Sequence, residues 1–162
     1  PIFITFLIVI YSRNIMKKIL YSFLLLSSAT LFAQKNTATK FAVANDIVGT
    51  VDMFNNNNYK GSVQSSKAYK SATELPQNLK KFDYLADNGL VEYKLKSNQA
   101  VIDRMPVNEL NAQFGLPADT PVLIDGYEFT NTKTLVYGDI INNAQVITSN
   151  GKKMVSVTTS RK

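Results

Sequence analysis

Alternation between apolar and polar residues predicts several β-strands along the chain. It is clearest in residues 90–96, where the odd positions from Val91 to Leu95 are apolar and Glu92, Lys94 and Lys96 are charged. A period of two places alternate side chains on opposite faces of a strand, so this segment should be half-buried. Weaker patterns predict strands over 47–54 and 134–137, and an irregular or edge strand over 59–70.

Two dipeptides that end in glycine predict tight hairpins near the C-terminus. Asp125-Gly126 interrupts VLIDGYEF, and Asn150-Gly151 separates NAQVITS from KKMVSVT. Both positions of each pair tolerate positive φ, as a two-residue hairpin turn requires. Paired positions across such a loop sum to a constant, which fixes the register of the second hairpin. The predicted pairs are Val146 with Val155, Ala144 with Val157, and Ile147 with Met154.

Two further segments carry the period of a helix. Apolar side chains recur every third or fourth residue in 75–88, where Pro76 suits the first turn and Gly89 suits a left-handed end. Ser71 and Glu74, just before it, have the spacing of a capping box. A second, shorter helix is predicted from Pro106 to Gly115. The core side chains expected from the two helices are Leu75, Leu79, Phe82 and Leu85, and Val107, Leu110 and Phe114.

The order of these elements predicts the fold class. Strands and two helices follow one another without regular alternation, and the four asparagines Asn55 to Asn58 favour a turn over a helix or a strand. We therefore expect an α+β fold, with a mostly antiparallel sheet and two short helices packed on it. Residues 34–162 have the length of a single globular domain.

Residues 16–33 have the three-part layout of a secretory signal peptide. Lys17 and Lys18 form the positive beginning, an apolar run follows from Ile19 to Phe32, and Ala33 is the small residue before the expected cut. The alternatives are a buried N-terminal helix and an uncleaved anchor. The apolar run is shorter than the about 20 residues that a membrane-spanning helix needs, which favours the signal peptide.

The segment before this leader, residues 1–15, contains no methionine, so we interpret it as translated from upstream of a start at Met16. The expected mature chain is then 34–162, exported to the periplasm or outside the cell. Without the basic residues of 1–33, the formal net charge of +6 falls to +3, with 15 basic and 12 acidic side chains. No dense basic cluster remains, so nucleic acid is not an expected partner, and the mature chain has no expected membrane span.

The absence of cysteine and histidine narrows the possible chemistry. It excludes disulfides, thiolate nucleophiles, a lipid-bearing N-terminal cysteine, catalytic triads with histidine and histidine zinc sites. The run Asp87 to Gly89 lacks the further oxygen ligands of a calcium loop, and no glycine-rich phosphate loop occurs. We predict no catalytic residue, no cofactor and no metal site.

Carboxylates are the remaining catalytic option, because a pair of them can hydrolyse a glycosidic bond. Asp83 and Asp87 share a predicted helix face, and Asp125 lies close to Glu128 in sequence. Charged side chains are mostly solvated, so neither pair is predicted to be catalytic. A small glycan hydrolase nevertheless stays open as an alternative, and it would require a concave pocket lined by two acidic groups.

Three segments near the C-terminus follow one another in a family pattern. Residues 122–129 form an apolar strand with Asp-Gly, 139–147 begin with Asp-Ile and continue as an apolar strand, and 155–161 are Val-rich and end in Thr-Thr and a basic residue. These about forty residues resemble the plug domains of TonB-dependent outer-membrane receptors. The pattern departs at Ser149 to Lys153, where plugs have small residues and Tyr-Gly, and no barrel sequence follows. The resemblance implies a free-standing, plug-like module that acts by protein contact.

The sequence as a whole predicts a non-enzymatic binding module that contacts a cell-envelope protein. Unpaired strand edges are templates for partner strands, so an exposed sheet edge is one expected surface. The other is the hairpin that contains Asp125, Gly126, Tyr127 and Phe129. A structural or adhesive subunit that self-associates is a further alternative.

Overall fold

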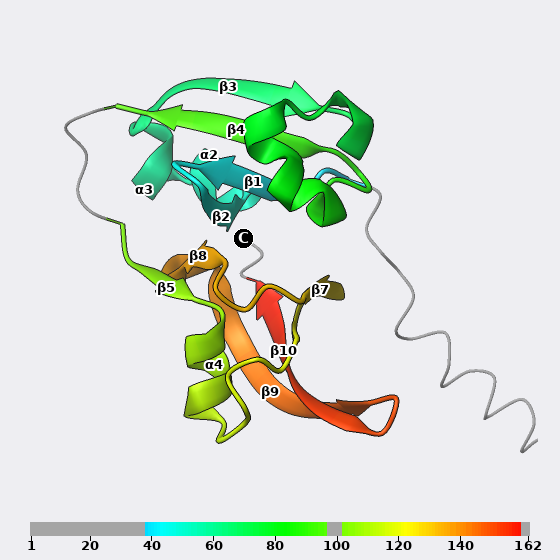
Figure 1. The fold of residues 1–162 in the computed structure, drawn as a ribbon. Coiled ribbons are helices and arrows are strands. Elements are labelled where there is room, and N and C mark those ends of the chain that lie inside the picture. The colour runs from blue at the N-terminus through cyan, green and yellow to red at the C-terminus, as the bar shows by residue number, and fades with distance from the viewer. Residues whose placement is uncertain (1–37, 97–101, 160–162) are drawn as a thin grey trace, which may run out of the picture. The chain divides into compact units, whose positions relative to one another are not determined.

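Two β-sheets form the fold of the described residues, 38–96 and 102–159, in the computed structural model (Figure 1). These residues belong to the compact unit Asn36–Lys162. The predicted signal peptide and the residues before it lie outside the described residues. Within the described part, no helix has the length and apolar character needed to cross a bilayer.

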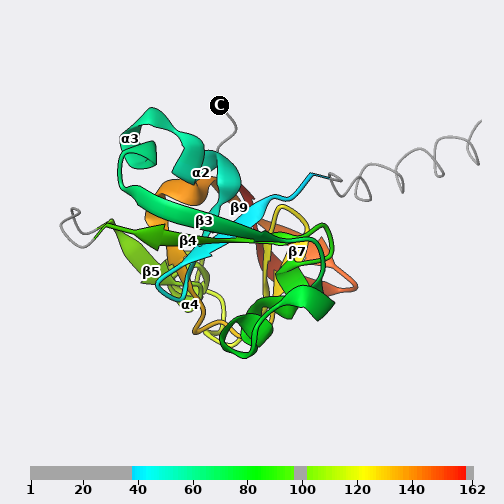
Figure 2. The ribbon, with the colours of Figure 1, turned by 90° about the horizontal axis from the view of Figure 1, so that it is seen from above.

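The larger sheet has six strands. In spatial order they are β3 (Val63–Tyr69), β4 (Leu90–Leu95), β1 (Phe41–Ala44), β2 (Ile47–Thr50), β8 (Leu135–Tyr137) and β5 (Arg104–Pro106). Figure 2 shows β3 and β4 side by side. β1 and β2 form a hairpin through Asn45 and Asp46, whose φ angles are 52° and 65°. β4 is parallel to β1 and β8 is parallel to β2, whereas β3–β4 and β5–β8 are antiparallel.

The smaller sheet has four strands, in the order β7 (Tyr127–Phe129), β6 (Val122–Ile124), β10 (Lys152–Thr159) and β9 (Ile141–Ser149). Both predicted hairpins are present, and all four turn residues have positive φ. The predicted register of the second hairpin is confirmed at all three pairs. β6 and β10 are parallel and join the two hairpins into one sheet.

Mixed α and β content is confirmed, and the mostly antiparallel sheet is confirmed in part. Among the described strands, five pairs are antiparallel, but the strands form two sheets, and three pairs are parallel, two in the larger sheet and one in the smaller. Antiparallel hairpins are signalled locally by their turns, whereas each parallel pair joins strands that lie far apart in sequence. The strand β1 and its turn at Asn45-Asp46 were also not predicted.

The predicted helix over 75–88 is the 3₁₀ helix η3 (Gln77–Leu85), with a kink at Phe82, and a separate 3₁₀ turn, η2 (Ala72–Glu74), precedes it. Pro76 explains the interruption, because a residue before proline disfavours the helical region and Leu75 is extended, at ψ 131°. Glu74 accepts a bond from the Lys70 N–H, but the Ser71 side chain makes no cap. The predicted core side chains Leu75, Leu79, Phe82 and Leu85 are all buried.

The second predicted helix is α4 (Asn108–Gln113). It begins after Pro106, which belongs to β5, and the chain leaves it through Gly115 with positive φ. Val107 and Leu110 are buried as expected, whereas Phe114 is 38% exposed, so its predicted core position is wrong. Phe114 follows the last helical turn with φ −100° and ψ 8°, outside the regular helix that set the predicted face.

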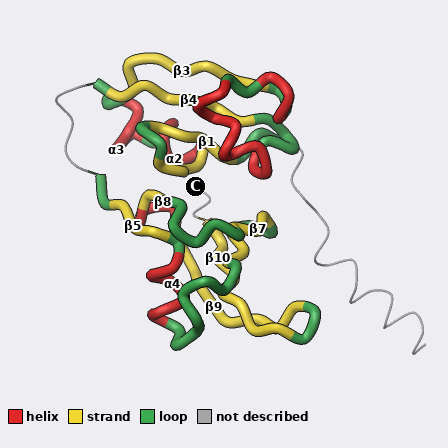
Figure 3. The backbone as a smooth tube through the Cα atoms, viewed as in Figure 1, coloured by secondary structure: helices red, strands yellow, loops and turns green. Residues whose placement is uncertain are grey.

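The predicted strand 47–54 ends early, at Thr50. The Thr50 hydroxyl accepts a bond from the Met53 N–H at 3.1 Å and begins the helix α2 (Val51–Asn55). Asn56 ends α2, and its side chain caps the helix α3 (Asn57–Lys60). Figure 3 shows α2 and α3 as two short helices in succession. The asparagine run is thus the junction of two short helices, and its prediction as a simple turn is wrong.

Candidate functional site

The predicted binding residues of the β6–β7 hairpin are mostly structural. Tyr127 and Phe129 are buried, and both rings pack edge-on against Phe41 of β1, at centroid distances of 4.9 and 6.1 Å. Of the four predicted residues Asp125, Gly126, Tyr127 and Phe129, only Gly126, at the tip of the turn, is exposed. These two rings therefore belong to the core and are not available as a contact surface.

Asp125 joins three parts of the chain. Its carboxylate lies 2.7 Å from the Lys40 ammonium, and it accepts bonds from the Thr159 N–H at 3.1 Å and the Thr159 hydroxyl at 2.5 Å. The Lys40 and Asp125 side chains are only 15% and 10% exposed. The Asp125 carboxylate thus binds the segment before β1, through Lys40, and the end of β10, through Thr159.

The other carboxylates considered for glycan hydrolysis do not meet in a pocket. Asp83 and Asp87 lie in or just after η3, and both are exposed. Glu128 is exposed on β7, while the neighbouring Asp125 is held as described above. None of these four residues lines the pocket described below.

Long, exposed strand edges are one possible contact surface. The edge strands β5 and β7 have three residues each, whereas β3 has seven and β9 has nine. β3 carries Lys67 and a register irregularity between Val63 and Ser65, two features that discourage added strands. β9, with the sequence INNAQVITS, contains neither charge nor proline.

The free side of β9 can be assigned from its register. Ser149 and Lys152 flank the two-residue turn as a hydrogen-bonded pair, and such pairs alternate along antiparallel strands. The backbone groups of Ala144, Val146 and Thr148 therefore point away from β10. No other described strand pairs with them, and Val146 is 41% exposed. β9 thus presents unpaired donors and acceptors next to an exposed apolar side chain.

A pocket of about 260 Å³ lies between α2, α3 and the 3₁₀ turn η4 (Gly138–Ile140). Its lining residues are Thr50, Asp52, Met53, Asn56, Asn58, Tyr59, Asp139 and Ile140. Asp52 stands in the first turn of α2, and the Tyr59 hydroxyl donates a hydrogen bond to Asp139, which links α3 to η4. Thr50, Met53 and Ile140 are buried and form the apolar and hydroxyl-bearing part of the wall.

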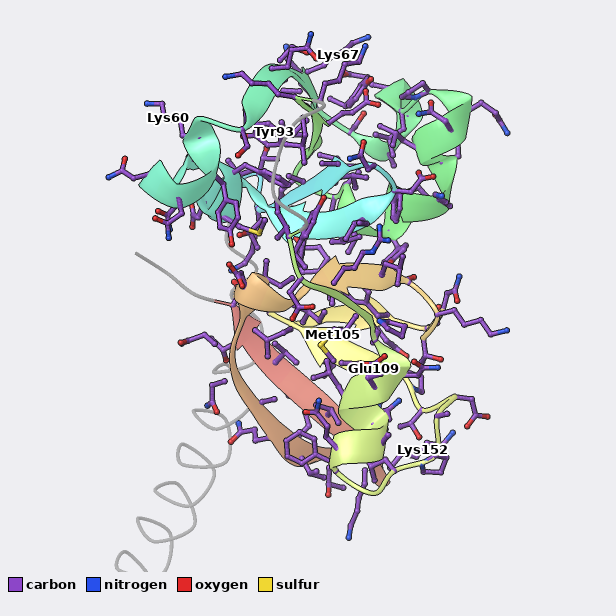
Figure 4. All side chains as sticks on the ribbon, turned by 90° about the vertical axis from the view of Figure 1, so that its left-hand side faces the viewer. Lys60, Lys67, Tyr93, Met105, Glu109 and Lys152 are labelled. Atoms are coloured by element: carbon purple, nitrogen blue, oxygen red, sulfur yellow. The ribbon has the colours of Figure 1, made fainter. Side chains whose placement is uncertain are left out.

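The charge of the pocket comes from its two carboxylates. No basic residue lines it, and Lys60, the nearest lysine in sequence, is exposed at the end of α3 (Figure 4). Burial raises the pKa of the neighbouring Tyr93, and the negative charge of Asp52 raises it further. Among the described residues, no group of three or more acidic, histidine or cysteine side chains could hold a metal ion.

Sequence reasoning missed this pocket because Asp139 is far in sequence from residues 50–59. The asparagine run between Asp52 and Tyr59 is the one local signal, and its composition predicts only a turn. Comparison with protein-family models, curated proteins and solved structures gives no match. The resemblance to receptor plugs is neither supported nor contradicted by these comparisons.

Proposed function

We propose that this protein is an exported, non-enzymatic binding module that holds an extended segment of a cell-envelope protein along β9. The observation that carries this proposal is the nine-residue edge of β9, which has no charge, no proline and no described neighbour on one side. Proteins usually protect exposed strand edges with charged residues, proline or a bulge. An edge without these features is therefore a favourable site for the addition of a partner strand.

The backbone supplies most of the expected affinity. Ala144, Val146 and Thr148 each direct one N–H and one C=O toward the open side, and each bond to a partner contributes about 0.5–1.5 kcal/mol net. The exposed Val146 adds an apolar contact beside them. Backbone pairing accepts many sequences, so side-chain contacts such as that of Val146 would set the preference for one partner.

Export to the periplasm or beyond is part of the same proposal. It rests on the lysine-led apolar leader 16–33 and on the similarity of 122–161 to receptor plugs, which act by contact with other envelope proteins. A partner in the envelope follows from that location.

Site-specific photo-crosslinking in the native cell tests the proposal. A photoreactive residue at Thr148, exposed on β9, should give one discrete adduct with an envelope protein, while the same group at Gln64, exposed on β3, should not. The substitution Val146→Pro removes one outward N–H and leaves the β9–β10 bonds intact, so it should weaken the adduct at least about tenfold. Val146→Ala keeps that N–H and should retain more of the adduct.

Three results would count against the proposal. They are equal adducts from both strands, an adduct insensitive to Val146→Pro, and an adduct with a second copy of this chain. The last would instead favour a self-associating subunit.

A further inference from the structure

The pocket between α2, α3 and η4 combines hydrogen-bond donors and acceptors in a way that restricts its ligand. Asp52 and Asp139 only accept bonds, whereas the amides of Asn56 and Asn58 can both donate and accept. The Thr50 hydroxyl accepts a bond from the Met53 N–H and retains its own hydrogen to donate. A ligand that fills the pocket must therefore offer both donors and acceptors.

This combination disfavours simple ions. An anion would approach two carboxylates without a basic side chain in the lining. A metal ion would find fewer than three acidic side chains in this described part of the chain. An organic cation could satisfy the carboxylates, but it would leave the amide and hydroxyl donors without acceptors, and unpaired donors weaken binding.

A neutral polyhydroxyl ring meets all these conditions. Each hydroxyl both donates and accepts, and two neighbouring hydroxyls can bind one carboxylate. Met53 and Ile140 give the wall an apolar part, against which the C–H face of a sugar can pack, and the Tyr59 ring lies in the same lining. Pockets for larger ligands measure about 300–1,000 Å³, so about 260 Å³ fits one ring.

We propose that this pocket binds one neutral monosaccharide unit, either free or at the end of a glycan chain. Asp52 accepts bonds from two ring hydroxyls, and Asn58 bonds a further hydroxyl. Asp139, oriented by the Tyr59 hydroxyl, accepts a bond from another hydroxyl of the ligand. The site is separate from β9, so this proposal does not depend on the proposed function.

Calorimetric titration of the purified full chain tests the site. The probes are glucose, galactose and N-acetylglucosamine, then cellobiose and chitobiose, with putrescine and calcium chloride as the competing chemistries. Saturable binding of at least one sugar is expected. Equal affinity for a monosaccharide and its disaccharide would indicate a free sugar, whereas tighter binding of the disaccharide would indicate a glycan end.

Two substitutions of pocket residues test whether the sugar binds in this pocket. Asp52→Asn and Asn58→Ala should each weaken the sugar about tenfold, because each removes hydrogen bonds from the ligand. Both residues are exposed, so the circular dichroism spectrum and the melting temperature should stay unchanged. Asp83→Asn removes an exposed carboxylate outside the pocket and serves as the matched control.

Several results would overturn the assignment: no binding of any sugar, binding of putrescine or calcium alone, or a sugar affinity that neither pocket variant changes. Val146→Pro should leave sugar binding unaffected, so failure here and failure of the strand-addition proposal can be told apart.

Discussion

Replacing Asp125 by asparagine should destabilise the protein by removing a largely buried charge and weakening a hydrogen bond, without changing the backbone of the turn. Asparagine tolerates positive φ, so the turn at φ 48° keeps its conformation, and the side chain keeps its shape. The substitution leaves the Lys40 ammonium, whose side chain is 15% exposed, without its carboxylate at 2.7 Å. It also replaces one of the oxygens that accept bonds from Thr159 by an amide nitrogen.

The expected cost follows from the burial of the pair. Breaking a fully buried ion pair by removing one partner costs about 3–5 kcal/mol. The Asp125 side chain is 10% exposed, and the lysine stem can carry its ammonium toward water, which lowers the cost. We expect the free energy of unfolding to fall by about 2–3 kcal/mol, including about 1 kcal/mol for the weakened bond to Thr159.

Urea unfolding at neutral pH measures this change as a lower midpoint with an unchanged slope. A double-mutant cycle with Lys40→Met should give a coupling energy of about 1 kcal/mol or more. Each single variant leaves one largely buried charge without its partner, whereas the double variant leaves none. Asp46→Asn is the matched control, since Asp46 also has positive φ in a hairpin but its ion pair with Lys81 is 64% and 54% exposed. That control should cost less than about 0.5 kcal/mol. Equal effects of the two substitutions would refute this account of Asp125.

Two further predictions concern a tyrosine and a glycine. Burial raises the pKa of Tyr84 to about 12, and the negative charge of Asp83 contributes to the increase. The Thr134 hydroxyl lowers this pKa in part, although it does not form a hydrogen bond with the Tyr84 hydroxyl. The folded state then holds a proton that the unfolded chain releases near pH 10, so the free energy of unfolding should fall by about 2 kcal/mol between pH 10 and 12. Urea titrations across this range should show that Tyr84→Phe removes that part of the decline. Gly89→Ala should lower the melting temperature by several degrees in a thermal scan. The reason is that φ at Gly89 is +88° and the added Cβ would lie 2.6 Å from the Tyr69 carbonyl oxygen. An unchanged melting temperature would contradict this prediction.

Local signals predicted the parts of the fold that local chemistry determines. Asp125-Gly126 and Asn150-Gly151 gave two hairpins, and the second also gave its register. The periodic apolar residues of 75–85 identified core side chains correctly even though the backbone is 3₁₀, because burial depends on which face turns inward.

Pairings between distant segments could not be read in the same way. The parallel pairs β1–β4 and β6–β10 join strands that are separated by many residues, so no turn sequence predicts their pairing. The same limit applied to the sites. The hairpin pattern predicts Asp125 as a binding residue, but its carboxylate contacts Lys40 and Thr159, which lie near opposite ends of the described chain and carry no local signal of this contact.

The contact of Asp125 with both Lys40 and Thr159 has a consequence for how the chain is made. Synthesis proceeds from the N-terminus, so Lys40 emerges long before Thr159, and the carboxylate cannot make all of these contacts until β10 has appeared. β10 is also the strand that joins both hairpins of the smaller sheet. The nascent polypeptide should therefore stay incompletely folded in this region until β10 has been synthesised, however early the first strands appear.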